Sequence, residues 1–174
     1  MPTWVPVAGD DSVSTLIIGL APGLKGANRT GVPFTGDSAG DTLFAALKEA
    51  GLAHGTFTPD PNTSMQLLNC AITNAVRCVP PKNRPTGEEV NTCTGRYLTR
   101  TVARFKNLER IITLGKIAHD ATVRSLGAGI SEHRFAHNAR TRLGAIKLVA
   151  SYHCSRYNMN TGRLTFEMLS DVFR

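Results

Sequence analysis

One histidine of this sequence ends an apolar segment and precedes a run of polar side chains. The stretch is SYHCSRYNMNTGRLT, residues 151–165, and the polar residues that follow His153 are Ser155, Arg156, Asn158, Asn160 and Arg163. An imidazole changes charge near neutral pH, so a histidine among polar groups at a strand end can donate or accept a proton in catalysis. The histidines without such neighbours are His54, His119, His133 and His137. His153 is therefore the candidate catalytic side chain, with a purely structural histidine as the alternative.

A long glycine-rich loop follows the first apolar run of the chain. It reads GLAPGLKGANRTGVPFTGD, residues 19–37, with five glycines and two prolines. It is not the loop that binds nucleotide phosphates, because its lysine comes too early and no Gly-Lys-Ser/Thr ends it. The loop is therefore expected to hold something other than a nucleotide phosphate.

Apolar runs alternate with amphipathic segments along the whole chain. The expected strands lie at residues 15–20, within 66–76, at 110–114 and at 145–151. The expected helices lie at residues 38–51, 88–105, 116–126 and 164–173. Asp37 or Ser38 can cap the first of these helices, and Gly51 ends it. The alternation predicts an α/β fold, with one domain over residues 1–174 and a central four-stranded parallel sheet flanked by helices.

Four loops of unusual composition leave the carboxyl ends of the expected strands. They cover residues 21–37, 77–85, 115–117 and 152–163. Sheets of this kind bind ligands beyond those strand ends. A binding site is therefore expected where these loops leave the sheet.

The charge of the chain is strongly positive. Its 174 residues carry a net charge of +7, with a pI of about 9.6. This surplus favours a polyanionic partner, nucleic acid first, although a merely basic surface is the alternative. The first residues lack the features of a signal peptide, and no apolar run approaches the roughly 18 residues that span a bilayer. A cytoplasmic protein without membrane contact is expected.

Three segments together resemble the signature regions of uracil-DNA glycosylases. They are the loop 19–37, ITNAVRCVPPKNRP (residues 72–85) and SYHCSRYNMNTGRLT (151–165), in the order and spacing of that family. The resemblance covers nearly the whole chain and points to family 5, the broad-specificity branch related to the iron–sulfur family 4. It implies the three-layer sandwich of these enzymes and a hydrolase that cuts the bond between base and sugar in DNA.

The resemblance implies a pocket for a base extruded from the DNA helix, because glycosylases cannot attack a base inside the stack. Phe34 would stack on that base, and Asn74 would read its edge, since an amide both donates and accepts hydrogen bonds. A core phenylalanine and a turn-forming asparagine are the alternatives. The first loop would bring its backbone close to the base at Gly19, Ala21, Pro22 and Gly23.

The same resemblance implies how the bond would break. His153 would donate a hydrogen bond to the negative charge that develops on the base carbonyl, as an oxyanion hole does. The most efficient uracil glycosylases carry an aspartate where this chain has Ala21, and alanine cannot activate water. Asn28 is the expected water-positioning residue, and Asp37 is a second candidate that could equally cap the next helix. Because leaving-group stabilisation would then dominate, uracil, hypoxanthine and xanthine are all expected substrates.

The remaining expected contacts are with DNA. A side chain at or after Arg156 would wedge into the gap left by the extruded nucleotide. The expected contacts to phosphates and nearby DNA groups are Lys25, Arg29, Lys82, Arg84, Lys116, Ser155 and Arg163. Gly115 opens a helix N-terminus, which favours a phosphate. Plain surface charge is the alternative for each basic residue.

The cysteines bear on a cofactor. Relatives in families 4 and 5 hold a 4Fe-4S cluster with four cysteines, two of them before the first strand and two at the positions of Cys78 and Cys93. Residues 1–14 contain no cysteine, Cys70 lies in an expected strand, and Cys154 adjoins the candidate catalytic histidine. Two thiolates would support a cluster poorly. The expectation is no cofactor; the alternative is a cluster in a chain whose N-terminus is incomplete.

The expected function is a monofunctional DNA glycosylase that removes uracil and other deaminated bases, and so initiates base-excision repair at the nucleoid. Ala21 leaves open a uracil-DNA binding protein with little or no turnover. A third alternative is an unrelated nucleotide-binding α/β protein. Oligomeric state, the ranking of bases and the choice between single- and double-stranded DNA stay open.

Overall fold

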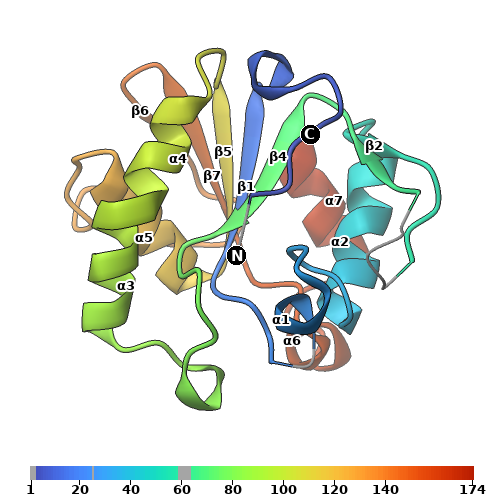
Figure 1. Ribbon diagram of the computed structural model, residues 1–174. Coiled ribbons are helices and arrows are strands. Elements are labelled where there is room, and N and C mark those ends of the chain that lie inside the picture. The colour runs from blue at the N-terminus through green and yellow to red at the C-terminus, as the bar shows by residue number, and fades with distance from the viewer. Residues whose placement is uncertain (1–2, 25, 59–63) are drawn as a thin grey trace.

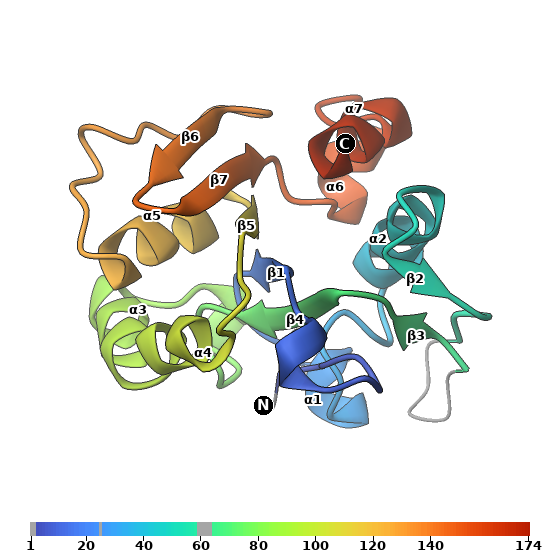
Figure 2. The ribbon, with the colours of Figure 1, turned by 90° about the horizontal axis from the view of Figure 1, so that it is seen from above.

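The computed structural model describes residues 3–24, 26–58 and 64–174. In this part of the chain, a twisted sheet of five strands lies between two helical layers (Figures 1 and 2). The order across the sheet is β4 (Cys70–Asn74), β1 (Thr15–Gly19), β5 (Arg110–Leu114), β7 (Ile146–Ser151) and β6 (Arg140–Leu143). The predicted α/β fold is confirmed, whereas the prediction of four strands is wrong.

The additional strand lies at one edge of the sheet. The four other strands run parallel to one another, whereas β6 pairs antiparallel with β7 across a two-residue turn at Gly144. Its sequence, Arg-Thr-Arg-Leu, alternates between exposed and half-buried positions. The apolar runs that mark the parallel strands are therefore absent from β6, because those strands are covered on both faces and β6 is not.

The opposite edge of the sheet is covered by the N-terminal segment. Trp4 forms an antiparallel bridge with Ile72 of β4, in which each backbone N–H donates to the carbonyl of the other residue, at 2.8 and 2.9 Å. The Trp4 ring also packs against Phe44 of α2, with 5.3 Å between ring centroids. The first described residues are thus part of the folded sheet.

Two helical layers cover the faces of the sheet (Figure 2). Helices α2 (Ser38–Glu49) and α7 (Phe166–Phe173) lie on one face, and α3 (Gly87–Cys93), α4 (Thr99–Arg104) and α5 (Lys116–Ser125) lie on the other. Alternate strand residues divide between the layers: Ile17 belongs to the core below α2 and α7, and Leu16 to the core below the other helices. This burial on both faces explains the continuous apolar strands.

The long helix expected over residues 88–105 is interrupted. A π-turn (Thr94–Leu98) joins α3 to α4. Thr86 and Glu89 form a capping box at the start of α3, which fixes where the helix begins. A π-turn inserts an extra residue and shifts the faces of the helix on either side of it.

Several short elements were not predicted. They are the 3₁₀ turns Asp10–Ser12 and Pro81–Asn83, the helices α1 (Ala27–Thr30) and α6 (Arg156–Asn160), and the hairpin of β2 (Ala53–His54) and β3 (Gln66–Leu67). Figure 1 shows α1 and α6 at the end of the sheet to which the parallel strands direct their carboxyl ends. In the described ranges, no helix is long and apolar enough to cross a membrane.

Candidate active site

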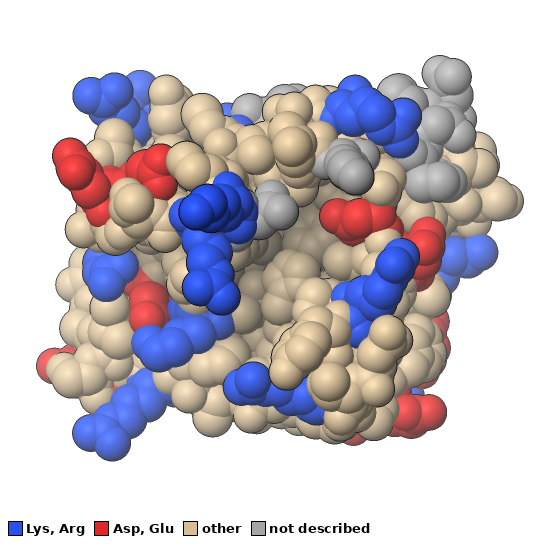
Figure 3. All heavy atoms as spheres, turned by 90° about the horizontal axis from the view of Figure 1, so that it is seen from below, with Lys and Arg blue, Asp and Glu red and all other residues tan. Residues whose placement is uncertain are grey.

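A cavity of about 360 Å³ opens beyond the carboxyl ends of β1, β4 and β7. Figure 3 shows the hollow from this side, with Lys and Arg side chains around it. Its lining residues are Leu20, Ala21, Pro22, Gly23, Ala27, Phe34, Asp37, Ala39, Asn74, Pro80, His153 and Ser155. The volume falls within the range of small-molecule sites. Phe34, Asn74 and His153, which are distant in sequence, thus face one space.

Phe34 occupies a backbone conformation that is rare for a side chain of its size. Its φ is 58°, in the left-handed region, and the residue is only 6% exposed. Its ring lies against the His153 ring, with centroids 6.1 Å apart and planes 23° from parallel. Hydrogen-bonded hydroxyls of Thr30 and Thr35 close the loop beside it. The surrounding loop therefore holds a strained residue in place, as is common at functional sites.

Two glycines leave room for this arrangement. A Cβ atom at Gly40 would lie 1.8 Å from the Phe34 carbonyl oxygen. A Cβ atom at Gly19 would lie 2.5 Å from both the Phe34 ring and the Asn74 side-chain oxygen. Since real Cβ atoms do not approach so closely, glycine is needed at both positions. The need for glycine at position 40, inside α2, was not evident from the sequence.

Asn74 is the last residue of β4 and lies beside Gly19 of β1. It is 5% exposed and lines the cavity. The following residue, Ala75, donates its backbone N–H to the Gly19 carbonyl at 2.9 Å. The strand end is thus hydrogen-bonded to its neighbour, which fixes the position from which the amide side chain enters the cavity.

His153 follows β7 and is anchored through the backbone on both sides. The Asn158 side-chain amide donates to the His153 carbonyl oxygen at 2.8 Å. The Tyr152 backbone N–H donates to Nδ1 of His137 at 3.2 Å, and the two rings stack with centroids 5.1 Å apart. Neither Asn158 nor His137 was predicted to have this role. Asn158 stood within the quoted motif, whereas His137 gave no signal in the sequence.

The charge state of His153 follows from its surroundings. Burial lowers the pKa of the imidazole from its ordinary 6.5, while the negative charge of Asp37 acts in the opposite direction. Burial disfavours the charged ring because the protein interior solvates ions poorly. The ring is therefore neutral at pH 7, with one N–H available as a hydrogen-bond donor.

Asp37 caps a helix and lines the cavity at the same time. Its Oδ1 accepts hydrogen bonds from the backbone N–H groups of Ala39 and Gly40, at 3.1 and 3.2 Å. A Cβ atom at Gly26 would lie 3.0 Å from the other carboxylate oxygen, Oδ2, so the glycine-rich loop packs directly against this group. One carboxylate oxygen thus holds α2, and the second remains on the loop side.

Asn28 has a different position. It lies on α1, is exposed, and falls outside the set of residues that line the cavity. Its backbone N–H donates to the Gly23 carbonyl at 3.1 Å. Of the two water-positioning candidates, Asp37 is the one that the fold brings to the cavity wall.

Most of the expected DNA contacts are exposed side chains on short helices and loops. The exposed residues of this set are Arg29, Lys82, Arg84, Lys116, Arg156 and Arg163. Ser155 lines the cavity, and Gly115 precedes α5 with a Cβ position 3.5 Å from the His153 Cβ. The Arg163 guanidinium lies over the Tyr152 ring, 4.7 Å from its centroid. Lys25 lies outside the described residues.

The four cysteines divide into two pairs. Cys78 and Cys93 line a shared cavity between the loop after β4 and helix α3. Cys70 and Cys154 are buried elsewhere, and burial raises the pKa of both thiols to about 12. Within the described ranges, no three His, Cys, Asp or Glu side chains are grouped so that they could hold a metal ion. A 4Fe-4S cluster takes four thiolates, so the described residues do not fit one.

The fold and the cavity define an α/β protein with a cavity of ligand size at the carboxyl end of a largely parallel sheet. Residues 6–174 match the family model described as the uracil DNA glycosylase superfamily. The chain belongs to that superfamily.

Named relatives refine the comparison. The chain is 43% identical to a type-5 uracil-DNA glycosylase of Thermus thermophilus, over 98% of this chain and 79% of the relative. It is 42% identical to one of Mycobacterium tuberculosis, over 99% of this chain and 66% of the relative. A type-4 uracil-DNA glycosylase of Pyrobaculum aerophilum is 36% identical over 71% of this chain and 55% of the relative. The resemblance to family 5 is thereby confirmed.

Proposed function

We propose that this protein is a monofunctional DNA glycosylase that removes uracil from DNA and so begins base-excision repair. The observation that carries the proposal is the convergence of Phe34, Asn74 and His153 on one cavity. Relatives named type-5 uracil-DNA glycosylases, up to 43% identical, support it. The partner is DNA that contains uracil or another deaminated base. Because that substrate is chromosomal, we place the protein in the cytoplasm, at the nucleoid.

In the proposed complex the extruded base enters the cavity. Phe34 presents its ring to the base, and Asn74 offers both a donor and an acceptor to the base edge. Gly19, Ala21, Pro22 and Gly23 let the backbone approach the base closely because their side chains are absent or small. The exposed cations around the mouth bind the flanking phosphates, and Arg156 occupies the gap in the duplex.

The bond between base and sugar then breaks with its electron pair moving to the base. The neutral His153 ring donates its N–H to the base oxygen on which negative charge develops, which stabilises the leaving group. The sugar carbon acquires positive character and takes up the oxygen of a water molecule. That water loses a proton, and the departing base gains one, so the step is balanced.

Water is positioned without a carboxylate at Ala21. Asp37 supports this role because it reaches the cavity wall with one oxygen not used in the helix cap; exposed Asn28 is the second candidate. A weakly activated water makes leaving-group stabilisation dominant, and this supports hypoxanthine and xanthine as further substrates. We also propose that the protein works without an iron–sulfur cluster, since Cys70 and Cys154 are buried as protonated thiols. An absorption spectrum of the purified protein tests the last point.

One assay tests the function. A duplex with a single uracil is incubated with the protein and treated with alkali, and strand breaks are counted. Removal of one donor to a developing anion costs about 10²–10³ in rate, so His153→Ala should lose that much cleavage. Asp37→Ser keeps a helix-capping oxygen but removes the carboxylate, and should slow cleavage more than Asn28→Ala.

The same assay decides between enzyme and binder. Ala21 favours the second candidate function, a protein that binds uracil in DNA with little turnover. A retained complex without breaks would support the binder, and the absence of both breaks and a complex would contradict both functions. Equal cleavage by the wild type and His153→Ala would contradict the mechanism.

A further inference from the structure

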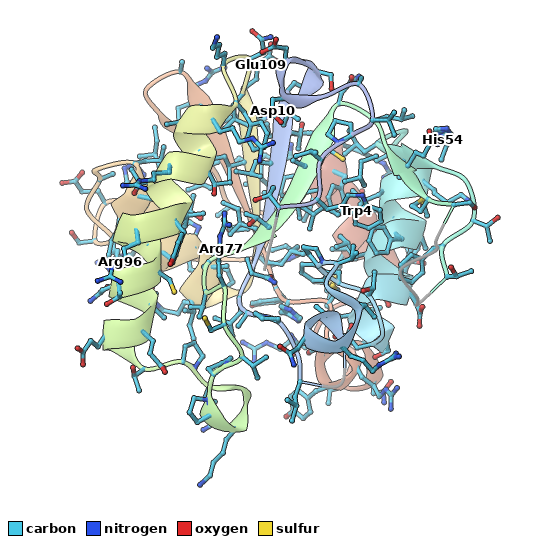
Figure 4. All side chains as sticks on the ribbon, viewed as in Figure 1. Trp4, Asp10, His54, Arg77, Arg96 and Glu109 are labelled. Atoms are coloured by element: carbon cyan, nitrogen blue, oxygen red, sulfur yellow. The ribbon has the colours of Figure 1, made fainter. Side chains whose placement is uncertain are left out.

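A third hollow lies on the helical layer formed by α3 and α4, beside the point where the chain leaves β4. Its volume is about 240 Å³, and its lining residues are Arg77, Arg96, Tyr97, Arg100, Thr101 and Arg104. Figure 4 labels Arg77, beside the end of β4, and Arg96, on the outer side of the helix. We call this hollow the arginine–tyrosine groove. It shares no lining residue with the cavity that holds His153.

The groove gathers the positive charge of four arginine side chains. Arg96, Arg100 and Arg104 recur at four-residue intervals across the π-turn, and like charges at this spacing destabilise a helix. Asp10 pairs with Arg104 through both carboxylate oxygens. Among the described residues, no acidic side chain lines the groove. An anionic ligand at Arg96 and Arg100 would therefore relieve this repulsion.

An exposed aromatic ring lies among these arginines. Tyr97 is 44% exposed, and the Arg77 guanidinium lies 5.4 Å from its ring centroid. Arg77 also donates to the Thr101 hydroxyl at 2.7 Å, and that hydroxyl donates to the Tyr97 carbonyl at 2.9 Å. The π-turn and these contacts fix the ring beside the guanidinium groups. A half-exposed ring held in this way offers a stacking surface.

We propose that the arginine–tyrosine groove binds an unpaired stretch of the DNA strand that flanks the target base. Guanidinium groups match phosphate oxygens in paired hydrogen bonds, and an aromatic ring stacks on any base. An acidic peptide would satisfy the arginines but would not use the ring. Arg77 lies three residues beyond Asn74, and α3 follows directly after the loop that carries Lys82 and Arg84. The exposed basic residues Lys82 and Arg84 thus lie along the chain between the cavity residue Asn74 and the groove, with Glu88 and Glu89 in the first turn of α3.

This inference rests on the proposed DNA substrate and extends it, because it gives the protein a preference for uracil next to single-stranded DNA. Two substrates test it: a blunt duplex with one uracil, and the same duplex with single-stranded overhangs at both ends. The wild type should bind the overhang substrate more tightly. The double variant Arg96→Ala/Arg100→Ala should lose that advantage and cleave the blunt duplex at the wild-type rate.

The dependence on salt measures the contacts directly. Each phosphate contact on a single strand contributes about 0.7 to the slope of log affinity against log salt, so the double variant should lower the slope by about 1.4. Tyr97→Ala should weaken overhang binding roughly 5- to 150-fold, as expected for one lost stacking contact, and Tyr97→Phe should not. Lys48→Ala/Arg124→Ala is the matched control, since it removes two charges from the last turns of α2 and α5.

The proposal fails if the wild type does not distinguish the two substrates, or if the groove variant behaves like the control. It also fails if polyglutamate competes as well as a single-stranded oligonucleotide of equal charge. Failure of the wild type to cleave the blunt uracil duplex would instead contradict the proposed function. The two results are therefore distinguishable.

Discussion

Phe34 and His153 face each other across the cavity, but the chain fixes them by different means. Phe34 depends on two neighbouring glycines. Gly19 and Gly40 have no side chain, and this leaves the space that the Phe34 ring and carbonyl group fill. His153 depends on side chains that its neighbours supply, namely Asn158 and His137, which hold the backbone around it. We call these two sides of the cavity the Phe34 wall and the His153 wall. An added atom should disturb the Phe34 wall, and a lost hydrogen bond should disturb the His153 wall.

The largest effect is expected where an atom is added to the Phe34 wall. Gly40→Ala would place a Cβ atom 1.8 Å from the Phe34 carbonyl oxygen, so the loop must move. Overpacking of this kind costs about 1–3 kcal/mol of unfolding free energy, and a shift of about 1 Å in a site costs about 10² in rate. Urea denaturation and the kcat/KM of uracil release measure the two effects.

Gly87→Ala is the matched control for this experiment. It lies at the start of α3, and its Cβ position has no described atom within 4 Å apart from its chain neighbours and the backbone of its own helix. The substitution should leave activity unchanged. If Gly40→Ala retained both stability and activity, Phe34 would not be held by close packing, and the contrast between the two walls would disappear.

A smaller effect is expected where a hydrogen bond is removed from the His153 wall. His137→Leu removes the acceptor for the partly buried Tyr152 N–H, and the loss of such a hydrogen bond costs about 1 kcal/mol. Since His153 directly follows Tyr152, its position should shift, and kcat should fall roughly fivefold or more with little change in KM. His137→Asn places an oxygen near the position of Nδ1 and should restore much of the rate. Equal rates for the Leu and Asn variants would show that the hydrogen bond does not position His153.

The smallest effect concerns pH. Burial lowers the pKa of both His137 and His153 from the ordinary 6.5. Below about pH 6.5 the unfolded chain therefore binds more protons than the folded chain, and the free energy of unfolding decreases as the pH falls through the lowered pKa values. Urea denaturation at pH 7.5 and 5.5 should show this loss, and His137→Asn/His153→Asn should reduce it. A wild type that gained stability on acidification would contradict the assignment of two neutral rings.

The sequence predicted the parallel strands better than the antiparallel edge strand. Apolar runs such as Leu-Ile-Ile mark strands that are covered on both faces, and these are the strands that were found. The edge strand β6 carries two arginines in four residues and is defined by its pairing with β7, which no local pattern reveals. Likewise, residues 88–105 have a helical composition throughout. The π-turn within them changes only how the helix faces before and after it are aligned.

The candidate site shows the same division. Phe34, Asn74 and His153 could be proposed from loop positions and family motifs, and the fold places all three around one cavity. Their roles stay predictions until they are tested. His137 reaches the site from the segment before β6, through a hydrogen bond to another residue's backbone. Such a contact depends on tertiary packing alone, so neither residue type nor spacing could identify it.

The bridge between Trp4 and Ile72 has a consequence for handling the protein. An uncovered edge strand offers unpaired N–H and carbonyl groups to other molecules, and exposed edges of this kind promote aggregation. Trp4 occupies part of the β4 edge, while the arginines of β6 make the other edge unattractive for strand addition. Removal of the first few residues should therefore expose the β4 edge and promote aggregation of the protein, even with every residue of the cavity intact.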